Sequence, residues 1–291
     1  MKFQVRATAL LAVMVASVLL SGCLVQKDKK PAKTYQSSTN TLHTYVSGNV
    51  ITYDLTKYSD PPEFGTLEVK WEQAALLQDP FSTTTSYSVL KETTSIYSNG
   101  NTSPDESTVR YIEQGSTGSL FLRAIHDITS QLPTDNYWLS DQATVPSGTL
   151  DRVEILHSPF TLGDSLQIDF DVMEGCSGSS CLQSLGHFSN HLDTADTAVV
   201  SGTRYGTFSN AYLVSYQGLV TTTAFPLPFF DFVDICHTTG SASTLHSGSF
   251  YIFPEVGVIK IENSCTSGTN QVVNYTATLR NTNIPLPPPT N

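Results

Sequence analysis

The stretch 66–73, TLEVKWEQ, decides the fold because apolar and charged residues alternate along it one by one. Its apolar residues are Leu67, Val69 and Trp71, and a charged residue follows each of them. Successive side chains of a β-strand point to opposite faces, so this period of two predicts a strand with one buried face and one solvated face. Such half-buried strands are typical of antiparallel sheets.

The same alternation returns in LQIDFDVM (166–173) and NYTATLRN (274–281), and turn clusters such as SNGNTSPDES (98–107) separate the strand-like runs. The segments CLQSLGHFSNHL (181–192) and AALLQD (74–79) are weak helix candidates, so we expect one or two short helices at most. With so few helices to cover its apolar face, a long sheet has to curl. We therefore predict an all-β fold, a long antiparallel meander curled into a half-barrel or barrel.

The N-terminus has the composition of a secretion signal. Lys2 and Arg6 precede an apolar run over 7–20, which is shorter than the about 20 residues of a transmembrane helix. Small residues and Cys23 follow directly. A basic start and a short apolar run before a cleavage site indicate a signal peptide. There are two alternatives. The chain is an ordinary secreted protein with an incidental cysteine, or the apolar run is an uncleaved anchor helix.

The sequence LSGC at 20–23 resembles the bacterial lipobox. The resemblance implies that the Cys23 thiol receives a diacylglycerol, that cleavage occurs before Cys23, and that the new amine is acylated, for example with palmitate. At least two acyl chains are needed for stable membrane binding. Leu24 stands where aspartate would favour the inner membrane, so the resemblance implies a lipid-anchored protein of the outer membrane.

These signals divide the chain into four parts. Residues 1–22 form the signal peptide, and residues 23–42 are polar and lysine-rich and are expected to be a flexible tether. The period-two pattern fills 43–284, which we interpret as a single β domain, and the proline-rich end at 285–291 is expected to be a stiff tail.

Charge and composition restrict the partners. The formal net charge is -11, and removal of Lys2 and Arg6 with the signal peptide makes it -13. A chain this acidic has no basic footprint for nucleic acid. We expect no cofactor, because the sequence has no Gly-x-Ser-x-Gly elbow, dinucleotide fingerprint or phosphate-binding loop.

Four cysteines remain once Cys23 is lipidated, and an even number in an oxidising compartment predicts two disulfides. Cys176 and Cys181 flank a Gly/Ser loop that can close on itself, which leaves Cys236 with Cys265. The second bridge needs loop flexibility, because strands two apart lie about 10 Å from each other. Zinc ligation is the alternative, although no paired CxxC motif supports it.

Three segments, SPFTLGDS (158–165), RYGTFSNAYLV (204–214) and FYIFPEVGVIK (250–260), occur in this order in the C-terminal half. Together they resemble the signature of uncharacterised bacterial secreted or lipid-anchored β domains. The resemblance implies a curved antiparallel sheet without established chemistry. Leu166, Tyr205 and Glu255 depart from the signature, and Glu255 replaces a glycine whose freedom to adopt positive φ bears on the turn.

Two groups of polar residues could carry chemistry. His187, His191 and Asp193 in GHFSNHLD form a weak metal candidate, because the two histidines would share one face of a helix, but the glutamate of a metalloprotease is absent. Asp169 and Asp171 project from the same side of a strand, at a spacing near that of inverting glycosidases. A solvated polar surface explains both groups better, so we expect no enzyme.

The aromatic run FPLPFFDF (225–232) is either core or the lining of an apolar site. The candidate ligand-binding residues are Phe225, Phe229, Phe230, Phe232, Tyr251 and Phe253. The expected function is that of a noncatalytic, membrane-anchored envelope lipoprotein that binds an apolar, lipid-like ligand or an envelope partner. A structural or assembly lipoprotein that recognises protein only is the alternative, and a hydrolase is the least favoured hypothesis.

Overall fold

A computed structural model of the 291-residue chain describes most of the chain from Lys33 onward. The described ranges are 33–58, 61–74, 76–82, 84–126, 136–140, 152–174, 176, 181, 183–222, 242–266 and 272–290. Within these ranges every regular element is a β-strand, and no helix has the length and apolarity that crossing a membrane requires.

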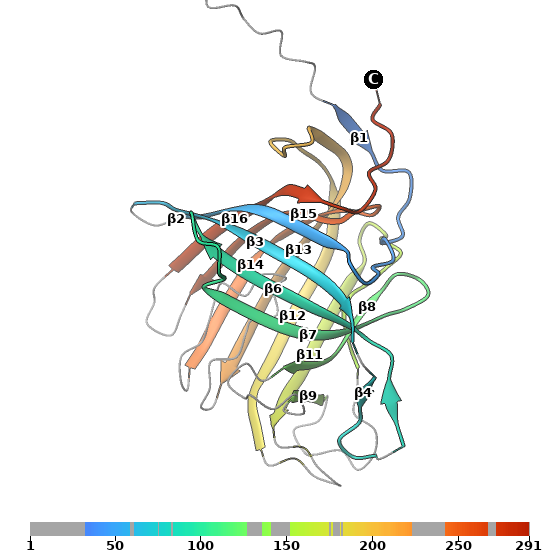
Figure 1. The fold of residues 1–291 in the computed structure, drawn as a ribbon, viewed down its shortest axis with the longest axis vertical. Helices are drawn as coiled ribbons and strands as arrows, with labels where there is room; N and C mark the ends of the chain where they lie inside the picture. Colours follow the sequence, from blue (N-terminus) through green and yellow to red (C-terminus); the bar gives the residue numbers. More distant parts are fainter. Residues whose placement is uncertain are drawn as a thin grey trace, which may run out of the picture. The chain divides into compact units, whose positions relative to one another are not determined.

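The strands follow one another closely along the chain (Figure 1). Their bounds are β1 (Thr34–Gln36), β2 (Val50–Tyr58), β3 (Glu63–Gln73), β4 (Leu77–Gln78), β5 (Ser86–Tyr87), β6 (Leu90–Ser98), β7 (Glu106–Gln114), β8 (Leu120–His126), β9 (Asn136–Ser140), β10 (Val153–Leu156), β11 (Ser165–Glu174), β12 (Gln183–Val200), β13 (Thr207–Thr222), β14 (Ala242–Phe253), β15 (Gly257–Thr266) and β16 (Val272–Thr282).

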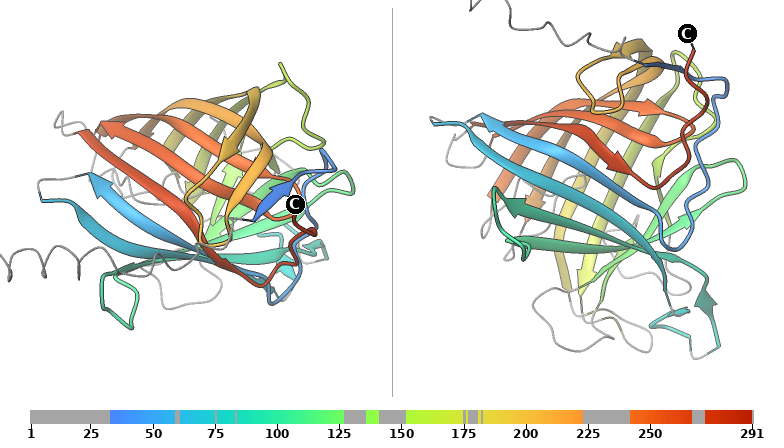
Figure 2. Two further views of the ribbon diagram at one scale, coloured as in Figure 1. Left: turned by 90° about the horizontal axis from the view of Figure 1, so that it is seen from above. Right: turned by 45° about the horizontal axis from the view of Figure 1, so that its top comes forward.

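Twelve of these strands close into an antiparallel barrel, which confirms the predicted fold class (Figure 2). The order around the barrel is β13-β12-β11-β9-β8-β7-β6-β3-β2-β16-β15-β14, and β14 pairs with β13 to complete the ring. Strand β10 pairs with β8, β1 adds to β13 in parallel, and β4 and β5 form a separate ribbon. Closure removes the free edges that a long open sheet would expose.

The stretch TLEVKWEQ lies in β3 with the predicted faces. Leu67, Val69 and Trp71 are buried inside the barrel, and the intervening residues are only partly buried. On the neighbouring strands β11 and β12, the buried rings of Phe170 and Phe188 stack with centroids 4.9 Å apart. The core therefore lies inside the ring of strands.

Both helix predictions were wrong. Residues 183–192 belong to β12, and Leu77–Gln78 is the short strand β4. In β12, Gly186 faces Val172 and Ser184 faces Met173, so Leu185 is the extra residue of a β-bulge. A bulge shifts the alternation of a strand by one residue. Leu185 and Phe188 are consequently both buried, at a spacing that imitates a helix.

The prediction of a flexible tether over 23–42 was wrong for its described end. Thr34–Gln36 pairs with the start of β13, and the buried Tyr35 ring stacks on Phe208 with centroids 5.1 Å apart. The proline-rich tail also packs back, because the Thr290 N–H donates to the Thr34 oxygen at 2.8 Å. The signal peptide and residues 23–32, with Cys23, lie outside the described residues.

Candidate functional site

Residues 37–49 cross one end of the barrel, and we call this segment the strap. Strand β2 starts at this end, β12 and β14 finish there, and Thr34–Gln36 joins the first residues of β13 there. We call it the strap end and the opposite end the far end. The far end carries the finish of β2 and β13 and the connection between β11 and β12.

Hydrogen bonds fix the strap along its length. The His43 N–H donates to the Pro254 oxygen at 2.7 Å, and the Phe160 N–H donates to the Asn40 oxygen at 2.7 Å. The Gln114 side chain accepts from the Tyr45 N–H and donates to the His43 oxygen, both at 2.8 Å. Bonds to backbone groups that would otherwise be buried without partners make the strap part of the folded structure.

The three segments that resemble a β-domain signature all hold the N-terminal chain. The first contributes Phe160, and the third contributes Pro254 and Glu255. The second contributes Gly206, where a Cβ atom would collide with the backbone of Lys33, so this glycine permits the close approach. These segments, far apart in sequence, therefore meet at the strap end.

Glu255, which replaces a glycine of that signature, does not disturb the turn. It is absent from the described residues with positive φ, where Asn210 is the single non-glycine residue. Its carboxylate instead accepts the Ser37 hydroxyl at 2.9 Å and the Ser38 N–H at 2.8 Å. Glu255 therefore contributes directly to holding the strap.

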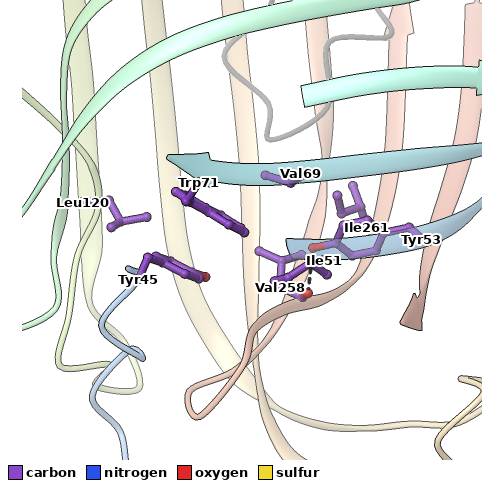
Figure 3. Close-up of a pocket in the computed structure, with 8 residues that line it drawn as sticks. All are labelled: Tyr45, Ile51, Tyr53, Val69, Trp71, Leu120, Val258 and Ile261. Carbon is purple, nitrogen blue, oxygen red and sulfur yellow. Dashed lines mark hydrogen bonds between the residues drawn. The ribbon is translucent and has the colours of Figure 1, made fainter. Parts of the chain in front are cut away.

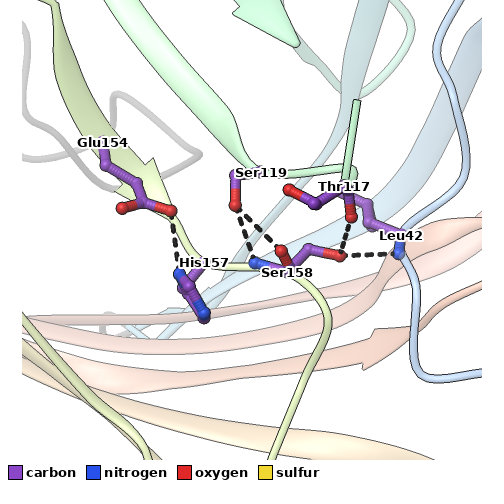
Figure 4. A network of polar contacts seen from close by, with 6 residues as sticks. All are labelled: Leu42, Thr117, Ser119, Glu154, His157 and Ser158. Atoms are coloured by element: carbon purple, nitrogen blue, oxygen red, sulfur yellow. Dashed lines mark hydrogen bonds and ion pairs between the residues drawn. The ribbon is translucent and has the colours of Figure 1, made fainter. Parts of the chain in front are cut away.

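Ser158 is the polar centre of this contact (Figure 4). Its buried hydroxyl donates to the Thr117 oxygen and accepts the Leu42 N–H, both at 3.0 Å. The neighbouring His157 ring contacts the Glu154 carboxylate at 2.9 Å instead. A nucleophilic serine needs a base within hydrogen-bonding reach of its hydroxyl. Here the hydroxyl is hydrogen-bonded to backbone groups of Thr117 and Leu42, so Ser158 holds the strap in place and has no base beside it in these contacts.

A small cavity lies inside the barrel beneath the strap (Figure 3). Its volume is about 10 Å³, and it is lined by Tyr45, Ile51, Tyr53, Val69, Trp71, Leu120, Val258 and Ile261. The Tyr45 ring, from the strap, stacks on Trp71 with centroids 4.2 Å apart. About one water molecule fits such a volume. Tyr45 therefore fills the strap end of the interior.

A charged pair is buried close to Tyr45. The Arg110 guanidinium donates from Nε to Oε1 of Glu92 at 2.8 Å, and the two side chains are 6% and 1% exposed. Burial raises the pKa of Tyr45, and the negative charge of Glu92 raises it further. Two charges inside an apolar barrel require each other, because each alone would be an uncompensated buried charge.

A second polar pair lies deeper in the interior. The buried Nε2 of His246 lies 2.7 Å from Oδ1 of Asn190, which accepts its hydrogen. Burial lowers the pKa of His246 to about 4, so the ring is neutral at pH 7. A Cβ atom at Gly218 would overlap Asn190 Oδ1, so this glycine leaves the room that the pair needs.

The predicted metal candidates lie on the outer face of the barrel. His187 and His191 are on β12, where His187 Nε2 lies 2.9 Å from Asp169 and His191 Nε2 lies 3.0 Å from Asp193. His187 also contacts Asp171 at 3.3 Å, so it lies between the two carboxylates of the glycosidase hypothesis. Among the described residues, no group of three His, Cys, Asp or Glu side chains has an arrangement that could hold a metal ion. The arrangement is a row of solvated contacts between histidine and aspartate side chains.

Two residues of the predicted apolar site, Tyr251 and Phe253, lie among the described residues. Phe253 is buried against Phe208, with centroids 5.0 Å apart. Tyr251 instead lies on the outer face, where its hydroxyl donates to Glu262 at 2.9 Å and Lys260 lies over its ring. Burial and this hydrogen bond raise the pKa of Tyr251 to about 12. The remaining candidates, Phe225, Phe229, Phe230 and Phe232, lie outside the described residues.

The local disulfide is present, because Cys176 and Cys181 are bonded with their Cα atoms 3.8 Å apart. Cys265 lies on β15, in register with His246 of β14. Its predicted partner Cys236 lies outside the described residues, so the second bridge stays a prediction.

Comparisons with known proteins add little. No family model and no curated protein matches the chain, so the resemblance of the three segments stays a prediction. Among solved structures the chain resembles a "putative lipoprotein" from Parabacteroides distasonis ATCC 8503, with 10% sequence identity and a TM-score of 0.38. The alignment covers 84% of this chain and 99% of that chain. Since likeness at this level carries no argument, the site has to be interpreted from its own residues.

Proposed function

We propose that this chain is a lipid-anchored, noncatalytic protein of the bacterial cell envelope whose rigid barrel binds another envelope protein through its surface. The observation that carries the proposal is the filled interior beneath the strap, where Tyr45 leaves a cavity of about 10 Å³. Pockets for small molecules commonly measure about 300–1,000 Å³. The interior beneath the strap has no room for such a molecule, which supports recognition on the outside of the barrel.

The lipid anchor comes from the sequence alone. The signal peptide and the Leu-Ser-Gly-Cys run at 20–23 support acylation of Cys23, and Leu24 supports sorting to the outer membrane.

The noncatalytic assignment is supported by the engagement of the best candidate groups. Ser158 is hydrogen-bonded to backbone, Glu92 is paired with Arg110, and His187 is paired with Asp169. A hydrolase needs a nucleophile, a base and a site for substrate within mutual reach. Within the described ranges, these groups are instead engaged in pairs that hold the structure.

Binding of an apolar, lipid-like molecule is the second candidate function, and the run 225–232 favours it because four phenylalanines lie within eight residues. Native mass spectrometry of residues 33–291, purified from an envelope extract, separates the two candidates. We expect a ligand-free mass. A copurifying amphiphile in stoichiometric amount would replace the surface-binding proposal with the ligand-binding one.

The anchor is tested separately, by labelling cells with radioactive palmitate. We expect the wild-type chain to be labelled and to sediment with membranes, and the Cys23→Ala variant to lose both properties. A Ser21→Ala variant is the matched control, because alanine keeps the small residue before the cleavage site. Unchanged labelling of Cys23→Ala would disprove the anchor.

A further inference from the structure

The chain enters the barrel at the strap end. The Thr207 N–H, at the start of β13, donates to the Lys33 oxygen at 2.9 Å, and the next three residues pair with β13. In Figure 2 the strand β1 lies beside the hairpin between β12 and β13. Everything that precedes Lys33 in sequence is therefore attached to this end of the barrel.

The length of chain between Cys23 and Lys33 limits which end can approach a membrane. Ten residues separate the two positions, and fully extended they span at most about 35 Å. Strand β13 runs from Thr207, next to Lys33, to Thr222 at the far end. Fifteen residues rise by about 50 Å along a strand, or about 40 Å along the axis of a barrel with ordinary strand tilt. The chain between Lys33 and Cys23 is therefore too short for a lipid on Cys23 to insert into a bilayer at the far end.

Apolar side chains project from the turns of the strap end. Leu76 follows β3, Leu162 precedes β11, and Val46 precedes β2, with exposed fractions of 66%, 53% and 53%. Val199, near the finish of β12, is also exposed at this end. Like Val199, the other large exposed apolar residues of the described chain lie within strands, and they are Tyr58, Phe64, Leu219 and Leu245. Apolar residues at turns can enter the headgroup region, where apolar contact adds to lipid anchoring.

The charge distribution along the chain also favours the strap end as the end that faces the bilayer. Residues 23–33 carry four lysines and one aspartate, whereas residues 34–291 carry nine basic and 25 acidic residues. Anionic headgroups attract lysines close to the surface and repel an acidic domain. Contact between the barrel and the bilayer therefore has to rely on its apolar turns and on the adjoining lysines.

We propose that the strap end rests on the bilayer that holds Cys23, with Leu76 and Leu162 in contact with lipid, while the far end with the Cys176–Cys181 loop is directed away from it. This inference rests on the lipid anchor of the proposed function. It adds a second, direct contact between protein and lipid and assigns the far end to the partner.

Tryptophan quenching in vesicles tests the orientation. The full lipidated protein is reconstituted into vesicles of phosphatidylethanolamine and phosphatidylglycerol, with and without bromine on the acyl chains. Single variants place tryptophan at the strap end, Leu76→Trp and Leu162→Trp, or in the far half, Phe64→Trp and Leu219→Trp. All four positions are exposed and apolar, so the two pairs are matched. The native Trp71 and Trp138 are buried and give a common background.

We expect brominated lipid to quench the added tryptophan at 76 and 162 and to shift its emission to the blue, with no change at 64 and 219. Equal quenching at both ends, quenching at the far half alone, or no quenching in protein that floats with the vesicles would each overturn the orientation and leave the anchor intact. Protein that does not float would overturn the anchor and the orientation together. The two strap-end positions are independent, so one variant that fails to fold leaves the other as the test.

Discussion

Replacement of Tyr45 by alanine tests whether the strap is an integral part of the barrel. The Tyr45 side chain is 6% exposed, stacks on Trp71 and lines a cavity that is already present. Truncation of a buried aromatic side chain to alanine costs about 3–5 kcal/mol, since lost burial and the new cavity both contribute. We expect Tyr45→Ala to lower the free energy of unfolding by about this amount.

Urea unfolding measures the effect, and Trp71 reports on it because its ring is the stacking partner. Two controls separate packing from other causes. Tyr45→Phe keeps the ring and should cost little, and Val46→Ala changes the adjacent exposed side chain and should stay within about 0.5 kcal/mol. Addition of p-cresol, which matches the deleted side chain, should raise the melting temperature of Tyr45→Ala and leave that of the wild type unchanged.

A loss below about 1 kcal/mol in Tyr45→Ala, with an unchanged Trp71 spectrum, would refute this reasoning. It would mean that the strap lies loosely on a barrel that is stable without it. The interior would then open easily at this end, and the ligand-binding alternative would gain support.

Three further predictions concern the interior and the far end. Arg110→Met leaves Glu92 buried without its partner and should destabilise the fold by about 3–5 kcal/mol. The double variant Glu92→Leu/Arg110→Met should recover most of that loss. Equal losses of stability in the two variants, measured by urea unfolding, would contradict the mutual dependence of the two charges. The pKa of His246 is lowered from 6.5 to about 4 in the folded state, so the unfolded chain takes up the proton first as the pH falls. This histidine should then remove about 3 kcal/mol of stability between pH 6.5 and pH 4, and a His246→Gln variant with the same pH dependence as the wild type would disprove it. Cys176→Ser/Cys181→Ser removes the disulfide and should lower the free energy of unfolding by about 2 kcal/mol. The measurement is the melting temperature of the variant against that of the wild type under oxidising conditions. An unchanged melting temperature would show that the bond does not stabilise the fold.

The fold class was predictable because the barrel wall is built from strands with one apolar face. Leu67, Val69 and Trp71 are buried as their alternation indicates. The pattern fails where the alternation shifts by a residue, as at the bulge of β12, where Leu185 and Phe188 are both buried. A sequence shows a bulge only as a break in period, and a break of that kind also suggests a helix.

The strap was missed because its signal is not periodic. The segment has few apolar residues, and its position depends on Ser158, Gln114 and Glu255, which are distant in sequence. Polar composition is typical of linkers, so the sequence favoured a tether as far as residue 42 and placed only the rest of the strap in the β domain. The three segments that resemble a β-domain signature could have indicated a common contact, but their meeting point is set by closure of the barrel.

The buried polar pairs, Glu92 with Arg110 and Asn190 with His246, are only weakly indicated by the sequence. Glu92 and Arg110 occupy inward positions in runs that otherwise alternate, and Asn190 does the same in β12. An isolated charge at an inward position indicates a buried partner on another strand. The identity of that partner depends on strand register, which turns and bulges determine, so the sequence alone could not provide it.

These pairs also bear on what the barrel can bind. A molecule that entered the interior at the strap end would displace Tyr45 and approach Glu92 and Arg110. Separation of a buried ion pair costs about 3–5 kcal/mol, and loss of the aromatic contact adds about the same again. An apolar ligand would have to offset both losses before it bound with any affinity. On the outer face towards the far end, by contrast, a partner would meet solvated groups such as His187, whose contacts can rearrange at little cost. The energetics of the interior at the strap end therefore support the proposed recognition on the outside of the barrel, at the end that the proposed anchor would leave free.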